Sequence, residues 1–166
     1  MQPTILTHPH PLLRQQAAAV TRFDDALTTQ IAQLQRAMLA GPGGVGIAAP
    51  QLGISRRIVV IDCRRSQRPC HNHGLLVMIN PEIRDAQGEG LGREGCLSVP
   101  DWVATVPRAK RICVHFQDQH GEAHEIHSRH FEARVIQHEI DHLNGILFID
   151  RILSRQALIR RVQRSA

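Results

Sequence analysis

Aromatic residues are the scarcest class in this sequence of 166 residues, since they make up 3% of the chain and tyrosine is absent. Proteins that bind single-stranded nucleic acid by stacking bases on rings need more aromatic side chains than this. Long apolar runs are lacking as well, because stretches such as Ile58–Ile61 and Ile146–Ile149 fall far short of the roughly 20 residues that span a bilayer. We therefore expect neither a DNA-binding protein nor a membrane protein.

Cysteine is also sparse, and the four thiols Cys63, Cys70, Cys96 and Cys113 are too few for a disulfide-stapled scaffold. In a reducing compartment each thiol is a buried apolar group, a metal ligand or a nucleophile, and its spacing must decide which. The segment Met1–Leu13 has neither the basic nor the apolar region of a secretory signal. These features predict a cytoplasmic protein.

The apolar content is sufficient for one core. Because 42% of the residues are hydrophobic and the chain is short, we expect a single domain over residues 1–166. The net charge of +5 and the pI of about 9.8 favour an anionic partner such as RNA. Net charge indicates the kind of partner that a protein meets, whereas its catalytic chemistry has to be inferred from sequence motifs.

Apolar spacing predicts a helix over Asp24–Ala40 that ends at Gly41, and a second helix over Phe131–Leu143 that ends at Gly145. Short runs of branched residues predict strands at Arg57–Ile61, Leu75–Ile79, Val103–Val106 and Arg111–Phe116. An amphipathic basic pattern predicts a C-terminal helix over Leu153–Arg164. Together these elements indicate an α+β fold.

His138, Glu139 and His142 form an HExxH pattern on the second predicted helix. The spacing of four places both imidazoles on one helix face about one turn apart, where they can chelate one metal ion. Glu139 can then reach an attacking water and act as a general base without being a ligand. Because so short a pattern also arises by accident, it does not settle the function alone.

A site of this kind needs a third protein ligand. Metalloproteases of the thermolysin kind take a downstream glutamate, but after Leu143 this chain has only one acid, Asp150. Metzincins take a third histidine at the position where this chain has Phe148. Cys96 is the remaining candidate and could complete a Cys-His-His site, although a cysteine considered alone is more often a small core residue.

A glycine-rich segment, Gly44–Gln51, combines an open backbone with the side-chain amide of Gln51. It lacks the lysine and the preceding strand of a phosphate-binding loop, so the sequence argues against nucleotide binding. A plain glycine-rich turn is the simpler interpretation.

These three segments resemble, in type and order, the motifs of peptide deformylases. They read GVGIAAPQ at 44–51, EGCLS at 94–98 and QHEIDH at 137–142, and the similarity extends from His8–Arg14 to His142–Phe148. The resemblance implies antiparallel β-sheets around a central metal-binding HExxH helix, with one N-terminal and one C-terminal helix. It also implies a cytoplasmic metal-dependent hydrolase that removes the formyl group from the N-terminal formylmethionine of nascent proteins.

The resemblance also implies roles for individual residues. The implied metal ligands are Cys96, His138 and His142. Glu139 is implied to move protons, while Gln51 and the backbone N–H of Leu97 hold the developing oxyanion. The peptide is implied to add as a strand beside Gly44, Val45 and Gly46, with its methionine side chain in a pocket partly lined by Phe131 and Val135.

Fe²⁺ is the cofactor that the resemblance implies. Zn²⁺, Ni²⁺ or Co²⁺ could substitute, because one thiolate and two imidazoles accept all four ions. The expected partners are N-formylmethionyl nascent peptides. The ribosome is a further candidate, since family members dock on it through a C-terminal helix and a basic helix over Leu153–Arg164 would suit RNA.

Among the positions that depart from the family pattern, Phe131 replaces a smaller aliphatic residue and His130 stands where glycine is common. They leave open a paralogue that acts on another small N-acyl peptide. A non-catalytic, ribosome-associated metal-binding protein is a further alternative, but the complete set of implied catalytic residues argues against it.

Other histidines and cysteines lie outside the three motifs. Cys70, His71 and His73, in the predicted polar loop Arg64–Gly74, could bind a second metal, although solvated side chains are the simpler interpretation. The stretch that contains His120, His124, His127 and His130 is expected to form an exposed strand and turn.

Overall fold

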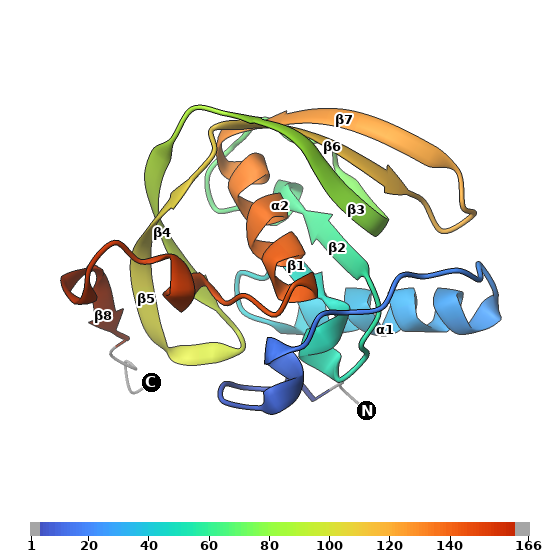
Figure 1. The fold of residues 1–166 in the computed structure, drawn as a ribbon, viewed down its shortest axis with the longest axis horizontal. Coiled ribbons are helices and arrows are strands. Elements are labelled where there is room, and N and C mark those ends of the chain that lie inside the picture. Colours follow the sequence, from blue (N-terminus) through green and yellow to red (C-terminus); the bar gives the residue numbers. More distant parts are fainter. Residues whose placement is uncertain (1–3, 162–166) are drawn as a thin grey trace.

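Two antiparallel sheets enclose one helix in the computed structural model, which describes residues 4–161. The helices are α1 (Asp25–Ala40) and α2 (His130–Leu143). The strands are β1 (Gly46–Ala48), β2 (Ile58–Asp62), β3 (Leu75–Gln87), β4 (Gly90–Cys96), β5 (Val99–Arg108), β6 (Arg111–Gln117), β7 (Ala123–Arg129) and β8 (Leu158–Arg160). The larger sheet has the order β1-β2-β3-β6-β7 and the smaller β4-β5-β8. Figure 1 shows α2 at the centre with the larger sheet curving over it, which confirms the predicted α+β fold.

The helix α1 begins and ends where the sequence predicts. The carboxylate of Asp24 caps it by accepting a hydrogen bond from the N–H of Leu27 at 3.1 Å. Its apolar face buries Leu27 and Leu34 in a core cluster that also contains Ile58 and Val60 of β2. This packing holds one side of β2 and so supports the strand that pairs with β1.

The helix α2 is buried along most of its length and packs against the larger sheet through residues such as Ile136 and Ile140. After its end, Gly145 adopts a φ of 73°, and a Cβ there would collide with the backbone carbonyl of Arg14. At its start, His130 has a φ of 57°, in the left-handed region that favours glycine. This conformation gives the physical reason why glycine suits position 130.

All four predicted strands are present, and three extend further than expected, as β3, β5 and β6. β7 falls in the histidine-rich stretch, where an exposed strand was expected. β1 and β4 were not predicted, because β1 has three residues and β4 contains three glycines, which weaken strand patterns. The predicted polar loop between β2 and β3 begins with a short 3-10 turn at Cys63–Arg65.

The predicted C-terminal helix is wrong over its described part. Arg155–Ala157 form a 3-10 turn and Leu158–Arg160 form β8, while residues 162–166 lie outside the described range. β8 pairs with β5, with Trp102 opposite Arg160 and Ala104 opposite Leu158. The backbone hydrogen bonds offered by the edge of β5 and the packing of Leu158 outweigh the helical pattern, which is a weak preference in so short a segment.

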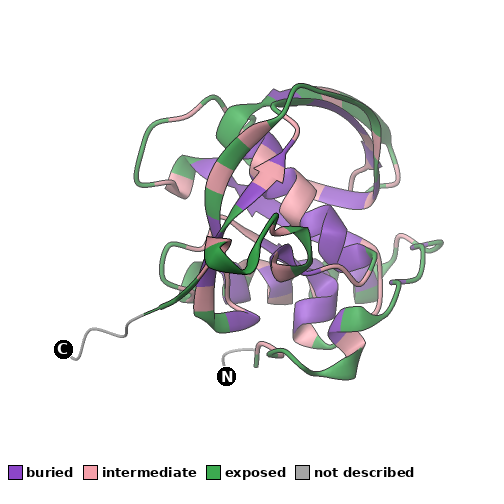
Figure 2. Cartoon of the chain, turned by 60° about the vertical axis from the view of Figure 1, so that its left-hand side comes forward, coloured by how far each residue is buried: buried purple, intermediate pink, exposed green. Residues whose placement is uncertain are grey.

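The buried residues form three clusters, around α2, around α1 and between the smaller sheet and the segment after α2. Figure 2 shows burial over most of α2, with exposed residues on the outer strands. Within residues 4–161, no helix combines the length and the apolarity that crossing a bilayer would require.

Candidate metal centre and active site

The three predicted metal ligands converge from two elements. Cys96 ends β4, after a register shift that follows Gly95, while His138 and His142 lie one turn apart on α2. One donor atom from each of the three side chains lies within 4.8 Å of the other two. The Sγ of Cys96 is 3.4 Å from Nε2 of His142. The chain thus brings one thiol and two imidazoles to a single point.

Glu94 orients one of these imidazoles. Its Oε1 lies 2.8 Å from Nδ1 of His138, which leaves Nε2 of the ring directed toward the site. The same carboxylate accepts two hydrogen bonds of 2.9 Å from Arg108 and one of 2.7 Å from Arg134. Burial alone would raise the pKa of Glu94, but its bonds to His138 and Arg108 hold it well below its usual value. Glu94 is therefore an ionised support for His138.

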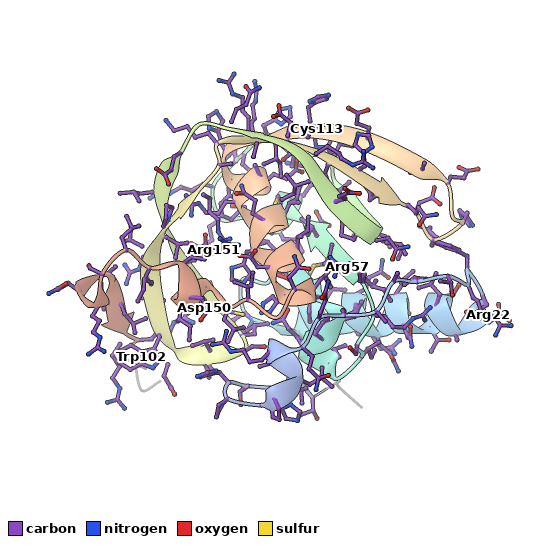
Figure 3. All side chains as sticks on the ribbon, in the orientation of Figure 1. Arg22, Arg57, Trp102, Cys113, Asp150 and Arg151 are labelled. Carbon is purple, nitrogen blue, oxygen red and sulfur yellow. The ribbon has the colours of Figure 1, made fainter. Side chains whose placement is uncertain are left out.

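A buried ion-pair chain extends from Glu94 to the end of α2. Arg108 donates to Asp141 at 2.6 Å, and Asp141 also accepts from Arg151 at 2.8 Å. Arg151 belongs to the 3-10 turn Phe148–Arg151, and Figure 3 shows it to the left of α2. None of these roles was predicted from the sequence. Glu94 could have been found inside the quoted motif, whereas Arg108 gives no local signal because its partners are distant in sequence.

Glu139 is only 5% exposed, and its Oε2 has no hydrogen-bond partner among the described residues. Burial raises the pKa of this carboxyl to about 7. Its Oε1 lies 3.9 Å from Nε2 of His138, so the group faces the same point as the ligand trio. A buried carboxyl with a free oxygen and a pKa near neutrality is suited to take up and release a proton.

His142 is the most deeply buried of the three predicted ligands and is only 1% exposed. Burial lowers the pKa of this imidazole well below 6.5, and the charges of His138 and Arg108 add to the effect. The ring is therefore neutral and keeps the lone pair that a metal ligand requires.

Gln51 lies in a 3-10 turn, Ala49–Leu52, directly after β1. Its Oε1 accepts a hydrogen bond from the N–H of Ala48 at 3.0 Å, so the Nε2 of the amide is directed toward Cys96 and Ser98. That nitrogen lies 3.6 Å from Sγ of Cys96 and 3.1 Å from Oγ of Ser98. An N–H donor is thus held next to the ligand trio.

One pocket contains most of the predicted site residues. Its lining includes Gly44, Val45, Gly46, Gln51, Cys96, Leu97, Phe131, Val135, His138 and Glu139. β1 is the edge strand of the larger sheet, and Gly46 packs so tightly on α2 that a Cβ would lie 3.0 Å from Val135. Phe131 is 38% exposed at this pocket, so its ring is available to a ligand. Three arginines that the sequence analysis did not single out also line it: Arg93, Arg134 and Arg161.

The second cluster considered from the sequence does not form. The thiol of Cys70 lies 3.5 Å from the carbonyl oxygen of Cys63, while Nδ1 of His73 lies 2.6 Å from Glu132. The thiol of Cys70 and the ring of His73 are thus directed to different partners, and among the described residues the donor atoms of Cys70, His71 and His73 do not form a metal-binding group.

Comparison with known proteins gives one consistent family. The profile of the family described as polypeptide deformylase matches residues 3–157. A peptide deformylase of Wolinella succinogenes is 43% identical over 148 residues, which cover 89% of this chain and 86% of that protein.

Solved structures agree with this match. A crystal structure of a peptide deformylase from Legionella pneumophila superposes with a TM-score of 0.85 at 40% identity, covering 95% of this chain and 89% of the other. A class I type b peptide deformylase from Acinetobacter baumannii, crystallised with bound Met-Ala-Ser, gives a TM-score of 0.85 at 36% identity, covering 91% and 99%. Sequence, fold and motif order lead to the same result: this chain belongs to the polypeptide deformylase family.

Proposed function

We propose residue roles for the reaction that the family assignment gives this chain. The protein is a metal-dependent hydrolase that removes the N-formyl group from nascent peptides. The observation that supports the roles is the meeting of one thiol, two imidazoles and an unpartnered buried carboxyl beside one pocket. The two alternatives, a paralogue for another acyl group and a non-catalytic protein, are not favoured by the relatives.

Cys96, His138 and His142 would hold the metal ion. The residues fit such an ion, because their donor atoms lie within 4.8 Å of one another and Sγ of Cys96 lies 3.4 Å from Nε2 of His142. A divalent cation held there would polarise the formyl carbonyl and lower the pKa of water toward about 7. Three protein ligands leave a position for the reactants, as in catalytic rather than structural sites.

Glu139 would carry the proton through the reaction. When the oxygen of water adds to the formyl carbon, the carboxylate accepts the proton that water loses. When the carbon–nitrogen bond breaks, Glu139 returns this proton to the departing nitrogen, so that formate and a free amine leave. Its pKa of about 7 suits both transfers.

Gln51 and the backbone N–H of Leu97 would hold the negative charge that develops on the formyl oxygen. The amide of Gln51 is fixed by its bond to Ala48, so it needs no rearrangement when the charge appears. Leu97 follows Cys96 directly and lines the same pocket. Donors held in advance at this point lower the barrier by stabilising the transition state.

The peptide would bind as an added strand along Gly44, Val45 and Gly46, because β1 is a sheet edge that faces the pocket. Main-chain pairing of this kind tolerates many sequences beyond the first residue. Phe131 and Val135 would contact the methionine side chain. The Acinetobacter baumannii enzyme was crystallised with Met-Ala-Ser, which supports a peptide that begins with methionine as the ligand.

The native metal would be Fe²⁺, with Zn²⁺, Ni²⁺ or Co²⁺ as possible substitutes. The support is the resemblance to the family together with a donor set of one thiolate and two imidazoles, which accepts each of these ions. Metal analysis of protein purified without oxygen tests this assignment, and a preparation that is fully active with zinc and contains no iron would contradict it.

We extend the proposal to cellular context. The chain would act in the cytoplasm as a single catalytic domain over residues 1–166. It would meet nascent chains at the ribosome, supported by the exposed Arg155 and Arg160 near the C-terminus. Charge reversal of both arginines should weaken co-sedimentation with ribosomes, and unchanged co-sedimentation would remove the ribosome from the proposal.

The deciding experiment pairs metal content with formate release from a formyl-methionyl peptide, for the wild type and Glu139→Ala. Loss of a general base typically costs 10²- to 10⁴-fold in rate, so we expect a loss of about this size with the metal retained. If Glu139→Ala loses the metal instead, the residue is structural and the assignment of the base is wrong. Exposed Glu82 provides a control, since Glu82→Ala should leave both quantities unchanged.

A further inference from the structure

A second group of metal-binding side chains lies on the larger sheet, away from the site described above. Its members are Cys113 and His115 of β6 and Glu125 and His127 of β7. Because side chains alternate along a strand, they occupy the face opposite to Ile112 and Val114, which are in the core around α2. Figure 3 shows Cys113 on the part of the sheet formed by β3, β6 and β7, well apart from Arg151.

The strand register brings these four side chains together. Cys113 lies opposite His127, and His115 lies opposite Glu125, two positions further along the β6–β7 ladder and therefore on the same face of the sheet. Cross-strand neighbours on one face have Cβ atoms about 5 Å apart, within reach of a shared ion. No local sequence motif joins these residues, since the pairs come from two separate strands.

The carboxylate of Glu125 is the centre of the group. Its Oε1 lies 3.0 Å from Sγ of Cys113 and 3.6 Å from Nε2 of His127, and its Oε2 lies 3.4 Å from Nε2 of His115. Donor atoms of Cys113, Glu125 and His127 all lie within 4.8 Å of one another. Ligands of a tetrahedral zinc ion are about 3.3 to 3.7 Å apart, as follows from bond lengths of about 2.0 to 2.3 Å. The observed separations are close to these values.

We propose that Cys113, Glu125 and His127 form a second binding site for a divalent transition metal of the zinc class, with the fourth position taken by water. Thiolate, carboxylate and imidazole are the donors that zinc takes in proteins. On binding, the thiol of Cys113 releases its proton to solvent and its sulfur bonds to the ion. The ion replaces the hydrogen bond that now joins this thiol to Glu125.

The surroundings of the group allow an ion to enter. The side chain of His127 is 79% exposed and that of Glu125 is 50% exposed. A pocket beside them is lined by Cys113 and His127 together with His71, Asp85 and Arg111, among others. Water can therefore reach the ion, and a site this open should bind metal less tightly than the buried one on α2.

A third group, Asp118, Glu122 and His124, has comparable spacing but is explained by a turn. Asp118 accepts hydrogen bonds from the N–H groups of His120 and Glu122 at 2.8 and 3.1 Å, and its other oxygen lies 2.7 Å from His124. The group also lacks a thiolate, so it serves as the control for nonspecific binding to surface histidines.

Zinc stoichiometry tests the proposal. The holoenzyme is dialysed to equilibrium against ZnCl₂ with a reductant, and metal per chain is counted by mass spectrometry. We expect the wild type to take up one equivalent beyond its catalytic metal. Cys113→Ser and His127→Gln should each lose that equivalent, whereas His124→Gln should keep it. Because His127 is on the surface, His127→Gln separates loss of the site from loss of the fold.

Three results would overturn the second site: no extra equivalent in the wild type, retention of it in His127→Gln, or its loss in His124→Gln. Formate release serves as a separate readout and should be the same in all of these variants. A failure of this proposal is thereby distinguished from a failure of the catalytic assignments, because Cys113, Glu125 and His127 take no part in the reaction proposed for α2.

Discussion

Glu94 Oε1 and Nδ1 of His138 lie 2.8 Å apart, and this contact determines which nitrogen of the ring faces Cys96. The carboxylate can accept only if Nδ1 carries the proton, so Nε2 is the nitrogen left to bind metal. Arg108 and Arg134 keep Glu94 ionised and in place. The orientation of His138 in the proposed metal centre therefore depends on Glu94, which is not one of the proposed ligands.

Replacement of Glu94 by glutamine should weaken metal binding. The amide keeps the shape of the side chain but loses the charge that supports His138, and loss of such a partner typically costs about 10- to 100-fold in metal affinity. The measurement is competition with a chelator, at a temperature where circular dichroism shows both proteins folded. Glu82→Gln, on an exposed side chain, is the matched control. Equal metal affinity in folded Glu94→Gln and wild type would contradict the orienting role.

Replacement of Gln51 by leucine should slow the reaction while the metal stays bound. The variant removes the Nε2 donor near Cys96, and loss of one oxyanion-holding donor costs about 10²- to 10³-fold in kcat. Steady-state formate release gives kcat and KM, and metal analysis gives occupancy. Ser98→Ala, which removes only the hydroxyl that Gln51 contacts, should have a smaller effect. A change confined to KM would assign Gln51 to substrate binding alone.

Replacement of His130 by glycine should stabilise the protein. His130 has a φ of 57°, a conformation that costs an ordinary residue roughly 1 to 2 kcal/mol. Glycine removes this cost, but part of the gain in stability is offset because glycine also raises the conformational entropy of the unfolded chain. The expected net gain is about 0.5 to 1 kcal/mol in urea unfolding. Arg129→Gly is the control, since its φ of −143° is ordinary extended backbone and no gain is expected there. Equal or lower stability of His130→Gly would show that the histidine side chain compensates for its backbone.

Replacement of Asp150 by asparagine should remove a pH-dependent part of the stability. Burial would raise the pKa of Asp150, but its ion pair with Arg14 and its bond to the N–H of Leu147 outweigh burial and lower it. A carboxyl with a lowered pKa stabilises the fold above its unfolded pKa of about 3.9, and this contribution is lost as the pH falls through the folded value.

Wild type should therefore exceed Asp150→Asn in stability near pH 7, by no more than about 1 kcal/mol because both partners of the pair are partly exposed. The difference should shrink below about pH 4. Urea unfolding of metal-free protein at both pH values measures it. A difference that stays constant with pH would mean that the ion pair with Arg14 does not lower the pKa.

Local patterns in the sequence were sufficient to predict α1 and α2. The spacing of His138 and His142 places them one turn apart on any helix, and the carboxylate of Asp24 caps α1 through contacts within four residues. Strands with branched residues, such as β2 and β6, were found for the same reason. The three motifs in their order were specific enough by themselves to indicate the family.

Contacts between segments that are distant in sequence could not be predicted from such local patterns. The pairing of β8 with β5 replaced a helix that its own sequence favoured, because a sheet edge supplied hydrogen bonds from residues about 55 positions away. The cysteine–histidine group in the loop after β2 did not form, whereas Cys113 and His127 met through strand register. The sequence of a loop does not specify the direction in which its side chains point, whereas a β-ladder places each side chain opposite a definite partner.

By itself, the sequence determined the chemistry available to this protein: a thiol, two imidazoles and a carboxyl of the types and spacing that metal hydrolysis requires. The tertiary structure alone decided the orientation and the pKa values of those groups. It brought Glu94 and Arg108 against α2 and enclosed Glu139, whose pKa depends on burial. Burial and charge contacts arise from residues far apart in the chain, and only the folded arrangement sets their distances.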